Sequence, residues 1–520
     1  MPICQKPIHR YSIALIFFFG VVHLAYAQLT QLPLPPSRMK ERIIREKIIK
    51  QDIKKIKQMR LTAPERNTAI WFEKNRYNSP LRWIFLSGMP KGADLHNSLA
   101  SGAYAENMLN YAAQNGKCIN AKTYSVNDPP CHTLESPSVK EAIQDDELRN
   151  RIIDAWSMRD FPENHNSYAH YLSAFVKFAP AIPGHRGDIL ALMLEQAAAQ
   201  KILYMEVPLK LVHKQAKELG DRAGIGSDYP HVFKRLNSSG LNTIIDRARS
   251  KLDHINRVLN RKLGCDSSHP KPGCYVRARF LYQVNRNLPP NEVFAQLVVG
   301  YELASSVPMV AGVNLSIPED GGNAIRYYQE QMDMIAFLHK RFPSVHLSLT
   351  AGDLVQGLVP PDELTNHIQD ALDIAHANRI EQGLDIAYET NPNQLINTMK
   401  KNRVLVLNCL ATDNNFLNLN SSEVPLDYYL QHHIPIALAT CDEGINRSDL
   451  TNEFEIASTS FNISYPQLKE FARNSLEYSF LNGQSLWANY TRHIRVAPCL
   501  HDIPGRDKPD ASCKVFLADN

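Results

Sequence analysis

Short apolar segments alternate with amphipathic segments along most of this chain. Eight segments have the composition of buried strands, and apolar residues recur at helical spacing between them. The strand-like segments are residues 92–99, 201–207, 275–284, 309–317, 345–353, 379–386, 403–411 and 435–443. Strands that alternate with helices predict parallel pairing, and eight of them predict a closed (β/α)8 TIM-type barrel in the α/β class rather than an open sheet.

Polar residues collect where these segments end. The ends read "HNS", "TAGD", "EQG", "NCLATD" and "TCDE", all of them polar or acidic after an apolar run. In barrels of this kind the chemistry lies at the carboxyl ends of the strands. The pattern therefore predicts a candidate site at that end. Residues 208–274, between the second and third strands, form a mostly helical insertion.

The first 27 residues have the features of an export signal. Lys6 and Arg10 precede an apolar run, and the stretch ends in a small-x-small pattern at Ala27. This predicts a Sec-type signal peptide, cleaved after Ala27, and hence a periplasmic or secreted protein. An uncleaved membrane anchor is the alternative, although the run is short for a span. No later segment is long and apolar enough to cross a bilayer.

Residues 28–80 begin with a Pro-rich linker and continue into a basic helix predicted over 38–60, "RMKERIIREKIIKQDIKKIKQMR". Its isoleucines recur at helical spacing and form an apolar stripe on a charged background. We expect this stripe to be buried, either on the main domain or on a sister subunit. Burial on a sister subunit would make the chain a homodimer, and this is the arrangement that we predict. Binding to a membrane surface is the alternative for a basic amphipathic helix.

Composition narrows the class of partner. The 520 residues are 44% hydrophobic and 21% charged with a net charge of +4, as in an ordinary soluble protein and without the excess of a nucleic-acid binder. Nine cysteines are present, one of them in the signal peptide. In an exported chain, proximity suggests the disulfides Cys118–Cys131, Cys265–Cys274 and Cys499–Cys513, which leaves Cys409 and Cys441 over.

The strand ends resemble those of the adenosine deaminase family, in particular its exported branch related to adenosine deaminase growth factors. The text that carries the resemblance is "MPKGADLHNSL", "VNLSIPED", "SLTAGDLVQGLVPPDEL", "RIEQGLDIAYE", "TCDEGINRSDLTNEF" and "RNSLEYSF". It places the barrel at residues 81–490 and a C-terminal tail at 491–520. The resemblance implies hydrolytic deamination of adenine nucleosides with one zinc ion.

The family's metal positions are mostly altered in this chain. Family members carry an H-x-H pair on the first strand, a His in "HAGE" on the fifth and an Asp on the eighth. Here His96 is kept, whereas Ser98, Thr350 and Cys441 replace the other three ligands. Hydroxyl groups are poor zinc ligands, and one imidazole does not hold zinc against water.

The catalytic positions are altered as well. Asp353 stands at the proton donor of "HAGE", and Gln382, in "RIEQG", replaces the assisting histidine of "RIGHG". Asp442 is kept at the purine-binding position. On the fourth strand, Ile317 lies near the position of the family's substrate-side glycine. A glutamine side chain cannot accept and release a proton as histidine does. The resemblance therefore implies that the catalytic positions of this chain are vestigial.

Cys441 has more than one explanation. A rebuilt zinc site could combine His96 and Cys441 with Asp353 or Asp442, since Cys and His are good zinc ligands. A disulfide from Cys441 to Cys409 is another reading, because neighbouring parallel strands lie ~4.8 Å apart. Two buried free thiols are the third.

The site residues therefore favour an exported, inactive homologue that acts by binding, without a cofactor and with a purine nucleoside as the expected ligand. The alternative is an active adenosine deaminase or related amidohydrolase with a rebuilt zinc site.

Overall fold

The computed structural model describes residues 36–132, 135–162, 165–316, 318–482, 485, 487–489 and 494–495. The predicted signal peptide, Ile317 and the predicted pair Cys499–Cys513 lie outside the described residues. The chain divides into two compact units, Met1–Asn75 and Arg76–Asn520.

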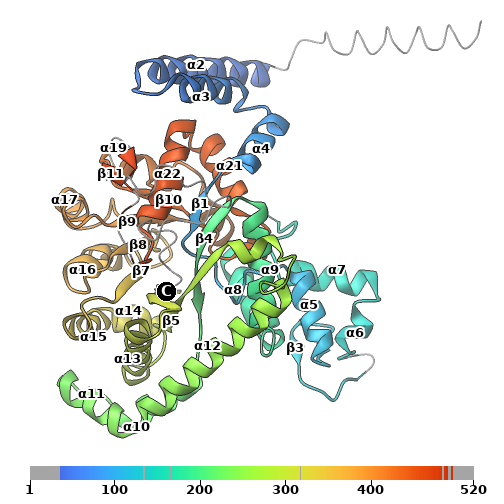
Figure 1. Ribbon diagram of the computed structural model, residues 1–520, viewed down its shortest axis with the longest axis vertical. Helices are drawn as coiled ribbons and strands as arrows, with labels where there is room; N and C mark the ends of the chain where they lie inside the picture. Colours follow the sequence, from blue (N-terminus) through green and yellow to red (C-terminus); the bar gives the residue numbers. More distant parts are fainter. Residues whose placement is uncertain are drawn as a thin grey trace, which may run out of the picture. The chain divides into compact units, whose positions relative to one another are not determined.

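The second unit contains the predicted barrel (Figure 1). Its eight strands form one sheet in the order β1-β4-β5-β6-β7-β8-β9-β10, and every neighbouring pair is parallel. The strands are β1 (Gly92–Asp94), β4 (Ile202–Leu209), β5 (Arg277–Asn285), β6 (Val310–Ser316), β7 (His346–Ala351), β8 (Arg379–Gln382), β9 (Leu405–Asn408) and β10 (Ile436–Leu438). All eight predicted strands and the TIM-type fold class are confirmed.

The sheet closes where β1 meets β10. Beyond the regular strands, Asn97 and Cys441 form a parallel bridge. Asp94 reinforces the seam, because its Oδ2 accepts a hydrogen bond of 2.6 Å from Thr440 Oγ1. Gly92, at φ +74°, lies against the last helix, where a Cβ would come within 2.1 Å of the Ala472 carbonyl oxygen. The closure brings the two ends of the barrel sequence to one place.

Helices surround the strands. They are α13 (Pro290–Ser306), α14 (Gly322–Arg326), α15 (Tyr328–Arg341), α16 (His367–Asp373), α17 (Pro392–Asn402), α18 (Leu410–Leu417), α19 (Leu426–Gln431), α20 (Glu443–Asn446), α21 (Leu450–Ser460) and α22 (Tyr465–Glu477). The first seven follow strands β5 to β9, with two helices after β6, two after β9 and one after each of the others, as expected for βα units. Buried apolar side chains on and next to β1, β4, β9 and β10 form one cluster of the core.

Two long excursions leave the barrel. The first, between β1 and β4, holds α5 (Ala105–Gln114), α6 (Val139–Ala142), α7 (Asp146–Ala155), α8 (Ser167–Phe178) and α9 (Arg186–Ala199), with the β2–β3 hairpin (Cys118–Ile119, Val126–Asn127). The second is the predicted insertion, with α10 (His213–Ala223), α11 (Tyr229–Ser238) and α12 (Leu241–Leu263). Disulfides Cys118–Cys131 and Cys265–Cys274 brace the two excursions.

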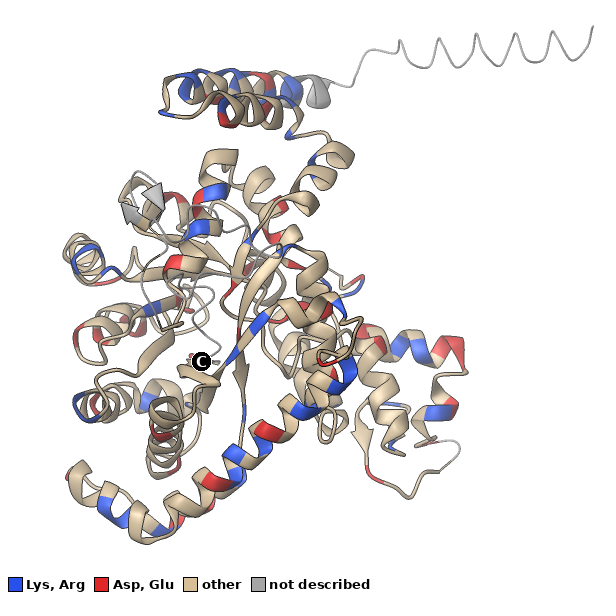
Figure 2. Cartoon of the chain, in the orientation of Figure 1, with Lys and Arg blue, Asp and Glu red and all other residues tan. Residues whose placement is uncertain are grey.

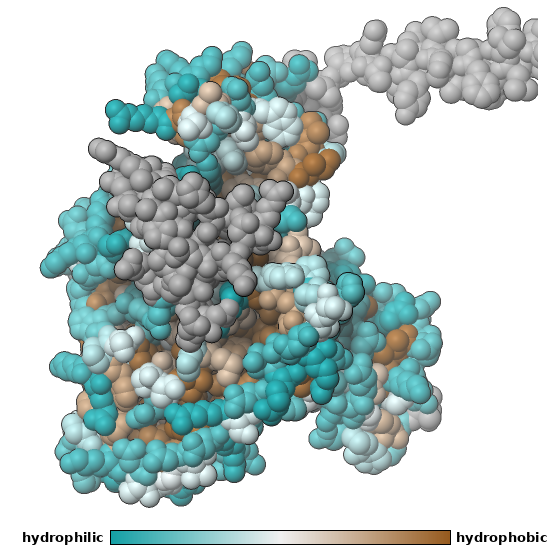
Figure 3. Space-filling view, viewed as in Figure 1, coloured by the Kyte–Doolittle hydropathy of each residue, from teal (hydrophilic) through white to brown (hydrophobic). Residues whose placement is uncertain are grey.

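The first unit is a pair of helices, α2 (Pro36–Gln58) and α3 (Ala63–Asn75). The predicted basic helix corresponds to α2, but its apolar stripe is divided. Ile56 is buried, whereas Ile43 and Ile44 are 48% and 57% exposed. Figure 3 shows apolar side chains at the surface of this unit among hydrophilic ones. The second unit begins with α4 (Ser79–Gly88).

Within the described residues, no helix has the length and apolar character needed to cross a membrane.

Candidate functional site

The ends of β1 and β10 bring three predicted site residues together. The backbone N–H of Cys441 donates to the carbonyl oxygen of His96 at 2.8 Å, and the N–H of Ser98 donates to that of Cys441 at 2.8 Å. The side chains of His96, Ser98 and Cys441 all line one cavity, together with those of Thr350, Asp353, Gln382 and Asp442. All seven candidate positions therefore converge at the carboxyl end of the barrel.

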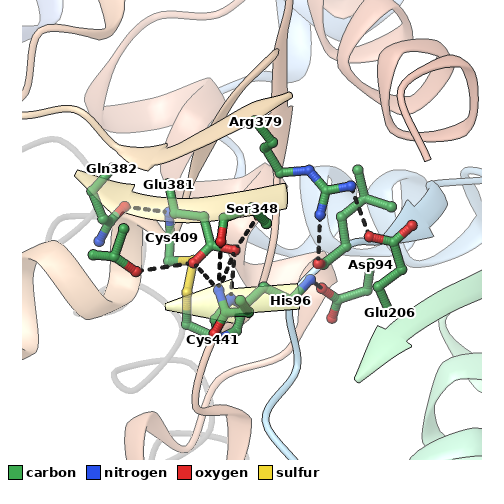
Figure 4. A network of polar contacts seen from close by, with 12 residues as sticks. Asp94, His96, Glu206, Ser348, Arg379, Glu381, Gln382, Cys409 and Cys441 are labelled. Carbon is green, nitrogen blue, oxygen red and sulfur yellow. Dashed lines mark hydrogen bonds and ion pairs between the residues drawn. A yellow bond between two sulfur atoms is a disulfide. The ribbon is translucent and has the colours of Figure 1, made fainter. Parts of the chain in front are cut away.

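His96 is held by a carboxylate that we did not assign from the sequence. Its Nδ1 lies 3.1 Å from Oε1 of Glu381, on β8 (Figure 4). Both side chains are more than nine-tenths buried. Burial alone lowers the pKa of His96, but the charge of Glu381, aided by Asp442 and Asp94, outweighs it and raises that pKa overall. The imidazole is thus oriented by an internal ion pair.

Glu381 lies in a cage of hydrogen-bond donors. Its carboxylate accepts from Ser348 Oγ at 2.6 Å, from Thr350 Oγ1 at 3.0 Å and from Asn314 Nδ2 at 3.1 Å. Burial raises its pKa, but the His96 charge and these hydrogen bonds outweigh burial and bring the pKa down to about 2. Thr350, at a family metal position, therefore serves as a donor to a carboxylate.

Arg379 lies two residues before Glu381 on β8, so both side chains point into the barrel. Its guanidinium donates to Glu206 Oε2 at 2.7 Å and to the Leu95 carbonyl oxygen at 3.1 Å (Figure 4). The Arg379–Glu206 ion pair is fully buried. Charged pairs thus run through the interior of the barrel beneath the site.

Gln382 is fixed by two partners, one directly after β9 and one on α18. Its amide group donates to the carboxyl group of Asp413 and accepts from the backbone N–H of Cys409 at 3.2 Å. Burial raises the pKa of Asp413 to about 8, although the Gln382 hydrogen bond opposes the rise. Gln382 has φ +73°, in the left-handed region. Its side chain has a structural role at the position of the assisting histidine.

Cys409 and Cys441 are joined in a disulfide, with their Cα atoms 6.0 Å apart. Three explanations for Cys441 were open: a zinc ligand, a disulfide and a free thiol. The structure contains the disulfide, which links the ends of β9 and β10 (Figure 4). A sulfur in a disulfide is not a thiolate and does not serve as a metal ligand. The rebuilt set of His96, Cys441 and an aspartate is therefore not formed.

Asp442 is already occupied by protein donors. Its carboxyl oxygens accept from the hydroxyl of Ser101 and, at 2.9 Å, from that of Tyr171. Burial raises its pKa, although these two hydrogen bonds and the charge of His96 oppose the rise. The purine-binding position of the family thus lacks a free carboxyl oxygen here.

Asp353 differs from Asp442 in this respect. Its backbone N–H donates to Glu319 Oε2 at 2.8 Å, but within the described part of the chain its buried Oδ1 has no hydrogen-bond partner. Burial, and then the charges of Asp413, Glu319 and Asp320, raise its pKa well above the usual value. Asp353 therefore has one buried carboxyl oxygen that is left for a ligand.

The cavity itself is small, about 160 Å³, whereas pockets for drug-sized ligands occupy about 300–1,000 Å³. Aromatic side chains from the first excursion and from α18, Tyr171, Phe175 and Phe416, form part of its wall. A larger open groove of about 630 Å³ lies among residues 122–177 and includes none of the strand-end residues.

The residues at the four metal positions do not fit a zinc ion. Ser98 and Thr350 offer neutral hydroxyls, the Cys441 sulfur is bonded to another sulfur, and a lone imidazole remains. Among the described residues, no group of three or more His, Cys, Asp or Glu side chains is placed to hold a metal.

The disulfide allows a direct chemical test. In Cys441→Asp, we expect Cys409 to become free, so that denatured protein shows one more titratable thiol per chain than the unchanged protein. Loss of the cross-link should also cost about 2–4 kcal/mol of the free energy of unfolding. The matched control is Cys131→Ser, which frees Cys118 in the first excursion. A thiol count that falls by one in Cys441→Asp would show that both cysteines are free thiols and would contradict the pairing.

Among the site residues that we did not assign from the sequence are Glu381, Ser101, Tyr171 and Asp413. One signal was present for the first, since "RIEQG" has Glu381 where "RIGHG" has glycine. The others come from segments whose approach to the site depends on the fold.

Comparison with known proteins gives the family. The adenosine deaminase family model matches residues 333–486. An adenosine deaminase of Clostridium perfringens strain 13 is 30% identical over 235 residues, which cover 40% of this chain and 69% of the relative. Another from the same species is 26% identical over 163 residues, 31% of this chain and 44% of that relative. The chain thus matches less than half of the latter protein's length.

Solved structures with a similar fold include an adenine deaminase from Arthrobacter aurescens, at 16% identity and a TM-score of 0.47 over 76% of this chain and 95% of that one. The N6-methyl-AMP deaminase of Arabidopsis thaliana has 15% identity and a TM-score of 0.48 over 77% and 94%. The 69% coverage of a 30% identical adenosine deaminase is the finding that assigns the family. By that likeness, and with eight barrel strands in the predicted order, this chain belongs to the adenosine deaminase family.

Proposed function

We propose that this chain is an exported, adenosine deaminase-like protein that acts by binding and does not carry out zinc-dependent deamination. One observation carries the proposal: of the two metal-capable side chains at the family's ligand positions, Cys441 is not available and His96 is left as a lone imidazole. His96 is paired with Glu381, and Cys441 is cross-linked to Cys409. The hydroxyls of Ser98 and Thr350 do not replace them.

The remaining positions support the same proposal. Gln382 has no titratable proton, and its amide is held by Asp413 and by the Cys409 N–H. Water activation in this family's site needs a group that accepts a proton near neutral pH. Without a metal and without that histidine, the cavity lacks both means of making a nucleophile from water.

A purine nucleoside is the ligand class that we propose for this cavity, held through the free oxygen of Asp353. We expect this binding to be weak for two reasons. The cavity is small, so its aromatic wall must move outward before the ligand enters, and Asp442 already accepts hydrogen bonds from the protein. Export is supported by the three described disulfides, since such bonds persist in oxidising compartments.

We expect the mature protein, incubated with excess zinc and then desalted, to retain less than stoichiometric zinc by elemental analysis. Its conversion of adenosine to inosine, followed by absorbance, should stay at trace level. Thermal unfolding with and without adenosine measures the weak binding in the same samples. One zinc per chain with a turnover of about 1–1,000 per second would overturn the proposal.

We further propose that α2 mediates homodimer formation, because exposed isoleucines on a charged helix gain free energy when a partner covers them. The variant Ile43→Glu/Ile44→Glu should be monomeric in light scattering, and a deletion of residues 28–60 should have the same effect. Lys40→Glu/Lys50→Glu, a larger charge change at exposed positions of the same helix, is the control and should remain dimeric. A full-length protein that is already monomeric would refute this proposal.

A further inference from the structure

A second pocket, of about 310 Å³, lies between the start of α9 and one side of α12. Its basic side chains are those of Arg186, Lys251, His254 and Arg257, and no Asp or Glu belongs to the lining. We call it the cationic pocket. It shares no residue with the cavity at the strand ends.

The packing of α9 on α12 brings the basic residues of the two helices together in this pocket. At Gly187, a Cβ would come within 2.5 Å of Val258 Cβ and 2.8 Å of the Ile255 carbonyl oxygen, so the two helices touch here. Only glycine allows that approach at this position. It places Arg186, the residue before, beside the basic residues of α12.

The positive charge of the pocket is not balanced by ion pairs. Among the described residues, none of Arg186, Lys251, His254 and Arg257 has an acidic partner within ion-pair distance. Helix α12 carries six basic and two acidic residues in its 23 positions. Figure 2 shows these basic residues spaced along the helix. One of the two acids, Asp246, is paired with Arg249.

The basic groups also act on one another. Burial lowers the pKa of Lys251, and the charges of Arg186 and Arg247 lower it further. Burial likewise lowers the pKa of Arg186. Like charges held together in this way are stabilised when an anion enters between them.

The larger groove near residues 122–177 also has basic residues, but there the arginines have acidic partners. There Arg151 is paired with Glu147, and Arg159 with Asp154 at 2.5 Å. Both arginines of that groove are thus already offset by the protein, and two aspartates, Asp154 and Asp160, also line it.

We propose that the cationic pocket binds a phosphate group, either as the free ion or as the phosphate monoester of a small molecule. A phosphate monoester carries a charge of about −1.5 to −2 at neutral pH. Two arginines and a lysine match its oxygens, because a guanidinium donates two parallel hydrogen bonds to them. The volume of the pocket suits a small molecule rather than a polymer.

The pocket adjoins the mouth of the barrel. Lys210 and Leu211, at the end of β4, are consecutive residues, of which Lys210 lines the strand-end cavity and Leu211 lines the cationic pocket. Lys210 and Arg186 both act on His213: burial lowers its pKa against a hydrogen bond to the Gln283 backbone, and these two charges lower it further, to about 4. The cationic pocket and the strand-end cavity thus both use the segment that directly follows β4.

Calorimetric titration of the full mature chain with inorganic phosphate, AMP and adenosine, at constant ionic strength, tests the proposal. Arg186→Gln/Lys251→Gln should bind phosphate at least about tenfold more weakly, since each charge-assisted hydrogen bond is worth roughly that factor. Arg186→Lys/Lys251→Arg, which keeps both charges, should bind nearly as well as the unchanged protein. Lys400→Gln/Lys401→Gln on α17 is the control for net charge.

Binding of AMP that is tighter than that of phosphate and also tighter than that of adenosine would identify a monoester as the ligand, and equal binding of AMP and phosphate would identify the free ion. Both results support the phosphate site. The absence of binding to either, or an equal loss in Lys400→Gln/Lys401→Gln, would overturn it. The single variant Lys251→Gln, at an exposed position, gives the same test should the double variant fail to fold. None of these results depends on zinc or on deamination, so they leave the proposed function to its own test.

Discussion

Stoichiometric zinc binding is expected to return to this barrel only when six positions are changed together. Five substitutions restore the family's residues: Ser98→His, Thr350→His, Asp353→Glu, Gln382→His and Cys441→Asp. The sixth is Glu381→Gly. Thr350 Oγ1 lies 3.0 Å from the Glu381 carboxylate, so a histidine at position 350 needs the space that Glu381 fills.

The reason for the combined change is that zinc needs several ligands at once, and partial sets bind weakly. The six-fold variant should bind one zinc per chain and gain thermal stability when zinc is added, because a metal that binds the folded state stabilises it by mass action. The five-fold variant, with Glu381 retained, is the matched control and should bind less than one zinc.

Elemental analysis and thermal unfolding with added zinc or chelator measure this result. Equal zinc binding by the two variants would show that Glu381 does not occupy ligand space. A well-folded six-fold variant without zinc would mean that the residue-by-residue assignment of the metal positions is wrong. That outcome would also remove the main support for the proposed function.

Removal of the Glu381 charge is expected to destabilise the unchanged barrel strongly. Glu381→Gln keeps the volume but leaves the buried His96 without its ion partner. It also sets an amide N–H group against donors that previously faced a carboxylate. Breaking a buried pair from one side typically costs about 3–5 kcal/mol of the free energy of unfolding. Glu218→Gln, at an exposed position, is the control for the same charge change and should cost little.

The pH dependence of this loss follows from the two pKa shifts. The pKa of Glu381 is lowered to about 2, so its contribution is complete above about pH 4.5 and is lost as the pH falls toward 2. The pKa of His96 is raised, so its contribution is complete below about pH 6.5 and is lost as the pH rises through the raised value.

The difference in unfolding free energy between the unchanged protein and Glu381→Gln should therefore be largest between about pH 4.5 and 6.5. Denaturant titrations at several pH values measure it. A difference that stays constant from acid to alkaline pH would contradict the ion pair and would leave a neutral hydrogen bond in its place.

The fold of the second unit could be predicted because its signals are local. Apolar runs of strand length alternate with helical spacing, and each depends only on neighbouring residues. The meeting of His96, Thr350, Gln382 and Cys441 could be predicted too, since the carboxyl ends of parallel barrel strands share one rim. The pair Cys265–Cys274 could also be predicted, because the two cysteines are close in sequence.

The partners of those residues could not be predicted in the same way. Glu381 reaches His96 across 285 positions of sequence, Tyr171 reaches Asp442 across 271, and Ser101 reaches Asp442 across 341. Whether Cys441 pairs with Cys409 or stays free depends on the direction of two side chains at the rim. Such directions are set by the closure of β1 on β10, and closure is a property of the whole sheet.

The cationic pocket shows the same division between local pattern and folded structure. The basic character of α12 can be read along its own residues, whereas the position of Arg186 depends on α9 coming to rest against α12 at Gly187. Strands, helices and the changed metal positions follow from short-range pattern and residue chemistry. The ion pair at His96, the occupied Asp442 and the unbalanced charge of the pocket arise only when distant segments pack together, because side-chain electrostatics depends on distance in space rather than in sequence.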